Sequence, residues 1–96
     1  MAFKILVSPI ANNNIDDAIK YYKLQSQSAA KSFRKKLLDA YKSLQINPFF
    51  AVKYKDVRAI PLKKLPYLVL FDVDEKEKIV NILSVFCTHQ NPEKYP

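Results

Sequence analysis

The 96 residues of this chain, 49% of them hydrophobic, suffice for one domain with a modest core and exclude two. Sixteen Lys and Arg against nine Asp and Glu give a formal charge of +7, which predicts an acidic partner: nucleic acid, an acidic protein segment or, less readily, a membrane surface. The single cysteine, Cys87, excludes an internal disulfide, and no apolar run is long enough to cross a bilayer, so we expect a cytoplasmic protein.

A short strand and a helix are predicted for the first part of the chain. Residues 3–7 form an apolar run that Pro9 stops, which indicates a strand. The three asparagines at 12–14 then supply capping side chains, and Asp16 and Asp17 place acids where the positive end of a helix dipole favours them. We therefore predict that the first helix begins near residue 12 and ends near residue 24.

A second, longer helix is predicted over about residues 28–46. The polar stretch at 25–28 interrupts the apolar pattern and offers a new cap, and apolar residues then recur at three- and four-residue steps. Asn47 ends the helix, because the residue before a proline is pushed out of the helical region. So short a connection folds the helices back on each other as a hairpin, packed on the sheet through four apolar side chains: Ile19, Tyr22, Phe33 and Leu37.

After Pro48 the pattern changes to that of a sheet. Residues 52–62, 67–73 and 78–88 are rich in β-branched and aromatic side chains, and the short turns between these stretches force antiparallel neighbours. The chain contains no glycine, so Asp, Asn or a longer loop must serve in the turns. The predicted fold is a single α+β domain over residues 1–96, with the order β-α-α-β-β-β and a sheet of four strands.

The positive charge is concentrated in the middle of the chain. Residues 26–52 and 53–64 each carry a net charge of +4, whereas residues 65–96 carry −2. Basic residues near the predicted turns are expected at one end of neighbouring strands, where an Arg fork suits phosphate or carboxylate and Lys reaches a polyanion. We predict that they bind a target or a phosphate; the alternative is that turns are simply charged. These residues are Lys55, Arg58, Lys63 and Lys64.

Four short motifs follow one another over residues 54–95: Asp56-Val57-Arg58, Leu62-Lys63-Lys64-Leu65-Pro66-Tyr67, Val73-Asp74-Glu75 and Asn91-Pro92. This set, in this order, resembles the RelE/ParE superfamily of toxins from type II toxin–antitoxin systems, and in particular its small plasmid-stabilisation members. The resemblance implies a cytoplasmic toxin with a cognate acidic antitoxin, and no cofactor or metal. One branch of the superfamily cuts ribosome-bound mRNA, and another poisons DNA gyrase.

The branch that cuts RNA implies a particular set of side chains. Cleavage without a metal needs a group to take the 2′-hydroxyl proton, a group to protonate the leaving oxygen, and cations to hold the charge on the phosphate. Tyr95 matches the C-terminal tyrosine of these relatives in place and type. His89 lies two residues beyond the histidine that many of them carry, which keeps it on the same strand face. The candidate catalytic residues are therefore His89 and Tyr95, with a surface histidine as the alternative for His89.

Other positions depart from the RNA-cleaving pattern. The arginine expected after Tyr67 is Leu68, and the basic strand positions before the turn hold Ala59 and Pro61. We therefore predict a toxin that inhibits growth by binding a macromolecular target such as DNA gyrase, without a membrane partner. The alternatives are a ribosome-dependent mRNA endoribonuclease and a degenerate toxin that binds only its antitoxin.

Overall fold

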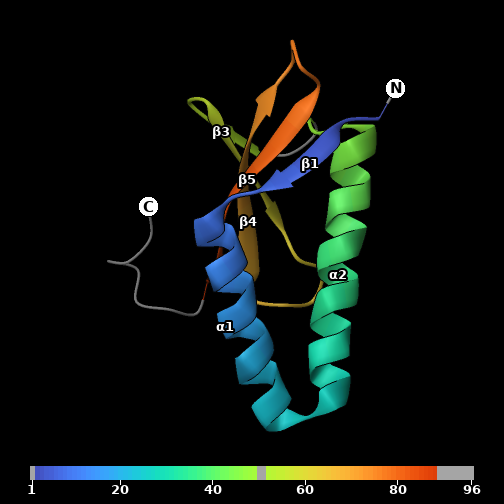
Figure 1. The fold of residues 1–96 in the computed structure, drawn as a ribbon, viewed down its shortest axis with the longest axis vertical. Coiled ribbons are helices and arrows are strands. Elements are labelled where there is room, and N and C mark those ends of the chain that lie inside the picture. Colours follow the sequence, from blue (N-terminus) through green and yellow to red (C-terminus); the bar gives the residue numbers. More distant parts are fainter. Residues whose placement is uncertain (1, 50–51, 89–96) are drawn as a thin grey trace.

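Two helices lie against one face of a sheet in the computed structural model, which describes residues 2–49 and 52–88 (Figure 1). In chain order the elements are β1 (Lys4–Val7), α1 (Pro9–Gln25), α2 (Gln27–Ile46), β2 (Val52–Tyr54), β3 (Val57–Pro61), β4 (Tyr67–Asp74) and β5 (Ile79–Cys87). The strand order in the described residues is β1-β5-β4-β3-β2; β1 runs parallel to β5, and the other neighbours are antiparallel. The predicted α+β arrangement of a strand, a helical hairpin and a C-terminal antiparallel sheet is confirmed.

The first helix begins earlier than predicted. Ser8 is its N-cap: the backbone of Ser8 is extended, and its Oγ accepts a hydrogen bond from the Ala11 N–H at 3.1 Å. Pro9 takes the first helical position, where an N–H would have no intrahelical partner. The asparagines at 12–14 therefore lie inside α1 rather than before it, and the predicted start near residue 12 is wrong.

The two ends of α2 lie where the sequence predicts them. Ser26, in the polar stretch, caps the helix, and its Oγ accepts a hydrogen bond from the Ala29 N–H at 3.0 Å. Asn47 is the C-cap, directly before Pro48. Because Ser26 alone separates α1 from α2, the chain reverses direction at this residue, and the two helices form a hairpin (Figure 1).

The stretch predicted as one strand over residues 52–62 is a hairpin of two strands. β2 and β3 are joined at Lys55 and Asp56, and Lys55 has a φ of 55°. Lys64 and Lys78 have φ values of 62° and 59° in the next two turns. Lysines thus take the left-handed conformation, which costs a non-glycine residue roughly 1–2 kcal/mol. The added turn gives the described sheet five strands instead of the predicted four.

Two side chains of the α1 region hold a bulge in β5. Leu70 pairs with Ser84 but Phe71 pairs with Ile82, so Leu83 is the extra residue. The Leu83 carbonyl accepts a hydrogen bond from Ser8 Oγ at 3.0 Å. Two residues further along β5, the Val85 N–H donates a hydrogen bond to Asn14 Oδ1 at 3.0 Å. These two bonds satisfy one carbonyl and one N–H of β5 beside the bulge and tie the α1 region to the sheet.

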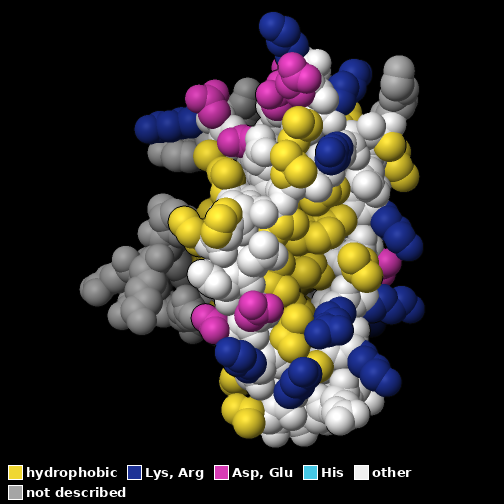
Figure 2. Space-filling model, viewed as in Figure 1, with side chains coloured by type: hydrophobic (Ala, Val, Ile, Leu, Met, Phe, Trp, Pro, Cys, Tyr) yellow, Lys and Arg dark blue, Asp and Glu magenta, His cyan; other side chains and the backbone are white. Residues whose placement is uncertain are grey.

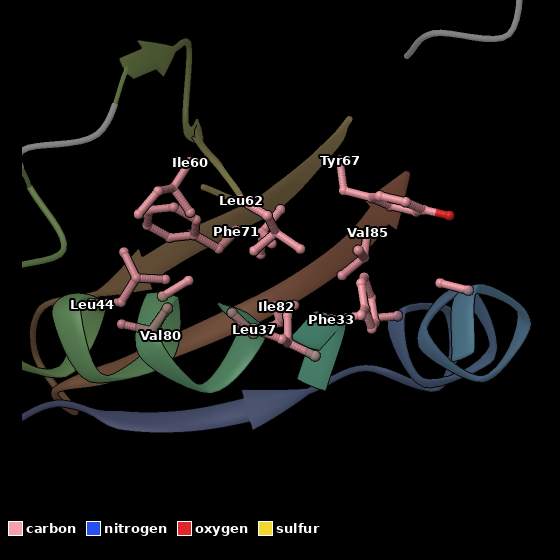
Figure 3. Close-up of a cluster of buried hydrophobic side chains, with 14 of the residues drawn as sticks. Phe33, Leu37, Leu44, Ile60, Leu62, Tyr67, Phe71, Val80, Ile82 and Val85 are labelled. Atoms are coloured by element: carbon pink, nitrogen blue, oxygen red, sulfur yellow. The ribbon is translucent and has the colours of Figure 1, made fainter. Parts of the chain in front are cut away.

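The core lies between the helices and the sheet (Figure 3). Along β4 the buried side chains alternate with half-buried ones, as expected for a strand covered on one face. The predicted register of the hairpin is confirmed: Phe33 is 0% exposed, Leu37 is 6% exposed and Tyr22 is buried, while Ile19 is half-buried against the core. The Tyr22 ring stacks on that of Phe33 with centroids 5.6 Å apart, and the Phe33 ring meets Tyr67 edge to face at 5.3 Å.

Candidate functional site

The four predicted target-binding cations lie at opposite ends of β3. Lys55 precedes the strand and Arg58 is its second residue, whereas Lys63 and Lys64 follow its other end. Five positions of extended chain between Arg58 and Lys63 correspond to about 16 Å. The expectation that the basic residues gather at one end of neighbouring strands is therefore wrong, because successive turns of an antiparallel sheet lie at opposite ends.

Arg58 lies in acidic surroundings. Its Nη1 donates a hydrogen bond to the Phe49 carbonyl at 3.0 Å, and its guanidinium carbon lies 5.2 Å from the centroid of the Phe49 ring. The same residues border a cleft of about 570 Å³ whose lining includes four carboxylates: Asp56, Asp72, Asp74 and Glu75. A phosphate in this cleft would meet those carboxylates. The contacts of Arg58 indicate that it holds the chain after α2, and its role in target binding stays a prediction.

Lys63 lies beside basic residues of α2. A cleft of about 460 Å³ between α2 and the β3–β4 turn is lined by three basic residues, Lys35, Lys36 and Lys63, and by one acidic residue, Asp39. Apolar side chains and two hydroxyl groups complete it: Ala40, Ile60, Pro61, Ser32 and Ser43. We call this cleft the basic groove. It brings together the two segments that each carry a net charge of +4.

Lys35 and Lys36 are absent from the predicted site residues. The helical pattern of α2 places them away from the buried stripe, as it does any solvated lysine. In the sequence, the net charge of +4 over residues 26–52 is the only indication that Lys35 and Lys36 belong to a site. That net charge does not show which turn of the sheet α2 packs against. Lys64 is exposed at the turn that carries Lys63. The structure thus places Lys63 in a groove and leaves Lys64 at its side.

The face of the sheet turned away from the helices is apolar over its centre. In the register of β3 and β4, Ala59 lies opposite Leu70 and Pro61 opposite Leu68. These residues alternate with buried ones, so their side chains point away from the core, and each is partly or fully exposed. We call this set the outer face: Ala59, Pro61, Leu68 and Leu70.

The predicted catalytic residues, His89 and Tyr95, lie outside the described residues, which end at Thr88. The Thr88 N–H donates a hydrogen bond to the Pro66 carbonyl at 2.7 Å, so the end of β5 lies beside the β3–β4 turn. The catalytic role of His89 and Tyr95 stays a prediction.

Another cleft, of about 610 Å³, lies between α1 and the ends of β4 and β5. Its lining includes Tyr21, Tyr22, Tyr67 and Cys87. Burial raises the pKa of Tyr67 to about 12, with a smaller contribution from the nearby Cys87 thiol, and burial also raises the pKa of Tyr22. Both phenols are therefore neutral at physiological pH and cannot serve there as bases.

The described residues, 2–49 and 52–88, contain neither a metal-binding cluster nor a membrane-spanning helix. His, Cys, Asp and Glu side chains nowhere in these ranges gather in a group of three that could hold a metal ion. Neither helix is long and apolar enough to cross a membrane.

Comparison with known proteins identifies the family. The protein-family model described as the ParE toxin of type II toxin–antitoxin system, parDE, matches residues 5–92 of this chain. The chain belongs to the ParE toxin family. It is thus a toxin of the type II, ParE/RelE-like class, and the resemblance seen in its motifs is confirmed. No curated protein matches the chain.

Solved structures share the fold of this ParE-family toxin. A chain of the chromosomal ParDE system from P. aeruginosa is 17% identical, with a TM-score of 0.76 over 92% of this chain and 98% of that one. The RelBE2 complex from Mycobacterium tuberculosis gives 14% identity and a TM-score of 0.58 over 91% and 99% of the two chains. Isolated E. coli RelE is 17% identical, with a TM-score of 0.53 over 96% of this chain and 90% of that one. At these identities the likeness shows the fold alone.

Proposed function

We propose that this toxin inhibits growth by binding a macromolecular target such as DNA gyrase, and not by cutting mRNA. The observation that carries the proposal is the outer face. Where the resemblance to RNA-cleaving toxins implies basic side chains, Ala59, Pro61 and Leu68 lie close together on neighbouring strands. Their side chains neither transfer protons nor carry positive charge. Losing one preorganised charge donor from such a site commonly costs a hundredfold or more in rate, on the order of 3 kcal/mol.

The chemistry of the outer face fits a protein partner. Contiguous exposed apolar side chains mark protein interaction sites, whereas nucleic-acid interfaces are polar and positively charged. The four residues of the outer face carry no charge, and the next residue of β4 on the same side, Asp72, accepts a hydrogen bond from the Asn81 side-chain amide. A protein target is therefore favoured over RNA at this surface.

The cognate antitoxin is proposed to occupy the basic groove. Two of the solved relatives come from complexes described as RelBE toxin–antitoxin complexes, which supports an antitoxin partner for this chain. Lys35, Lys36 and Lys63 would neutralise an acidic segment, while the exposed Pro61 offers an apolar contact. A partly disordered acidic tail would fold on binding there. The site of action is the cytoplasm, where both gyrase and ribosomes are found.

Two assays with the purified toxin test the mode of action. Inhibition of gyrase supercoiling is expected, whereas primer extension on ribosome-bound mRNA should reveal no toxin-dependent cut. Robust cleavage that disappears in Tyr95→Phe or His89→Ala would overturn the proposal and establish an endoribonuclease. Antitoxin binding with neither activity would identify a degenerate toxin.

Leu68→Glu tests the outer face itself. A charge on the apolar surface should abolish inhibition of gyrase and weaken binding of the antitoxin far less, because Pro61, which pairs with Leu68, is the one residue that the outer face shares with the basic groove. Leu38→Glu is the matched control, because Leu38 is an apolar side chain on α2 that is 56% exposed. Equal loss of inhibition in both variants would remove the outer face from the mechanism.

A further inference from the structure

The tip of the helical hairpin carries a run of positive charge. Residues 20–36 contain six basic residues and no Asp or Glu. Five of the six are exposed: Lys20, Lys23, Lys31, Arg34 and Lys35. Figure 2 shows Lys and Arg side chains gathered over the two helices in its lower half. We call these five residues the hairpin surface.

The charges of the hairpin surface are not neutralised from within. Within the part of the chain that the structure describes, none of the five cations takes part in an ion pair. The Asp16 and Asp17 carboxylates lie on α1 before the run begins, and Asp39 lies on α2 after it ends. Asp16 lies four residues before Lys20 and Asp39 four residues after Lys35, so three of the five cations, Lys23, Lys31 and Arg34, have no carboxylate one turn away on their own helix. Counterions or an acidic partner would screen these three.

Three of these cations converge on one recess. Lys23 of α1 and Lys31 and Arg34 of α2 line a cleft of about 180 Å³ together with Gln27 and Ala30. Three of the five lining residues are basic and one is a glutamine, with no Asp or Glu among them. An arginine fork binds phosphate oxygens in pairs, and lysines add point charges around them. This donor set suits a phosphate group.

We propose that the hairpin surface binds the phosphate backbone of duplex DNA. An acidic protein is the less suitable partner, because protein interfaces have an apolar centre and few lysines. The recess contains one small apolar side chain, Ala30, whereas the basic groove has Ile60 and Pro61. Phosphate contacts by Lys and Arg need no such centre, since they gain free energy by releasing counterions from the duplex.

The hairpin surface and the outer face lie on different sides of the molecule. The helices cover the face of the sheet opposite the outer face (Figure 1). The toxin therefore presents an apolar surface to a protein on one side and a cationic surface on the other. The choice of DNA rests on the proposed function, because gyrase is a DNA-bound target; the phosphate contacts themselves do not depend on it.

The experiment measures binding of the full chain to a short fluorescent DNA duplex by anisotropy over a range of salt concentrations. The triple variant Lys23→Gln, Lys31→Gln, Arg34→Gln should weaken binding by roughly tenfold or more near 0.1 M salt and reduce the log–log salt slope by roughly 2–3. Glutamine favours the helix, and circular dichroism checks that the fold is kept. The matched control removes three charges elsewhere, at Lys4, Lys42 and Lys76, and should leave both the affinity and the slope close to those of the unchanged chain.

Four outcomes would overturn the inference. The unchanged chain could fail to bind the duplex at low salt, or both triple variants could lose affinity equally, which would leave net charge as the only cause. Polyglutamate that competes as well as unlabelled DNA would assign the surface to an acidic protein, and an RNA duplex that binds more tightly than DNA would exclude DNA as the partner. Duplex binding by a chain that fails to inhibit gyrase would keep this inference and overturn the proposed function.

Discussion

Arg58 and Lys63 are five positions apart, yet their surroundings are opposite in charge. Arg58 shares a cleft with four carboxylates beside the β4–β5 turn, whereas Lys63 shares the basic groove with Lys35 and Lys36 of α2. The difference in charge comes from the elements beside each end of β3: the β4–β5 turn at one end and α2 at the other. A net charge counted along the chain, such as +4 for residues 53–64, therefore describes no single surface in an antiparallel sheet.

The hydrophobic core packs against β3 between the acidic cleft and the basic groove. We therefore expect the largest change in the free energy of unfolding from a core substitution. Phe33→Ala should lower the free energy of unfolding by roughly 3–5 kcal/mol, because the Phe33 ring is fully buried against Tyr22 and Tyr67. Leu38→Ala, at an exposed position of the same helix, should change it by less than about 0.5 kcal/mol. Urea unfolding measures both, and equal losses would contradict the register of α2.

Charge reversal sharpens the comparison at the basic end. Lys63→Glu with Lys64→Glu should slow association with an acidic antitoxin roughly tenfold or more and flatten its salt dependence, because electrostatic steering toward the groove is lost. Lys55→Glu with Lys76→Glu makes the same change in charge at the other end of the sheet and should slow association less. Stopped-flow kinetics measure both pairs. Indistinguishable rates would mean that net charge and not the basic groove guides the antitoxin.

Truncation sharpens the comparison at the acidic end. Arg58→Ala should lower the free energy of unfolding by about 1–2 kcal/mol, because the hydrogen bond to the Phe49 carbonyl and the contact with the Phe49 ring are lost. Association with the antitoxin should be unchanged. A variant that loses antitoxin binding with its stability intact would show that Arg58 contacts the partner and would reverse the roles of the two ends.

The smallest effect concerns a tyrosine packed against the core. Because burial raises the pKa of Tyr67 to about 12, the folded chain keeps a proton that the unfolded chain releases near pH 10. This contribution to stability is present below pH about 10 and is lost as the pH rises toward 12. Tyr67→Phe should therefore reduce the loss of stability over that range. Urea unfolding across the range decides, and parallel curves for Tyr67→Phe and the unchanged chain would contradict the raised pKa.

Local signals that have one meaning predict this fold well. Ser26 and Asn47 mark the ends of α2 because a cap after a polar stretch and a stop before proline act within a few residues. Pro9 has two meanings, since it both interrupts a strand and suits the first turn of a helix. The β2–β3 hairpin is not predicted, because its left-handed position holds Lys55 and not glycine, the residue that usually indicates such a turn.

The candidate site is less predictable than the fold. Lys63 is foreseeable as a turn cation, but its neighbours Lys35 and Lys36 depend on where α2 packs against the β3–β4 turn. The outer face is foreseeable as the absence of expected basic residues, while its continuity depends on the register that pairs Pro61 with Leu68. Contacts between distant segments are set by the packing of the whole domain, and local patterns do not encode them.

The parallel pairing of β1 with β5 sets a limit on when this toxin can become complete. Lys4 pairs with Ile79 and Val7 with Ile82, so the first strand waits for a partner that is synthesised about 75 residues later. Pairings of such long range close slowly, and a ribosome delivers the chain from its N-terminus. While β5 is still inside the ribosomal exit tunnel, β4 lacks one neighbour and β1 has no strand to pair with. A growing chain thus reaches its native surfaces only after β5 has left the ribosome.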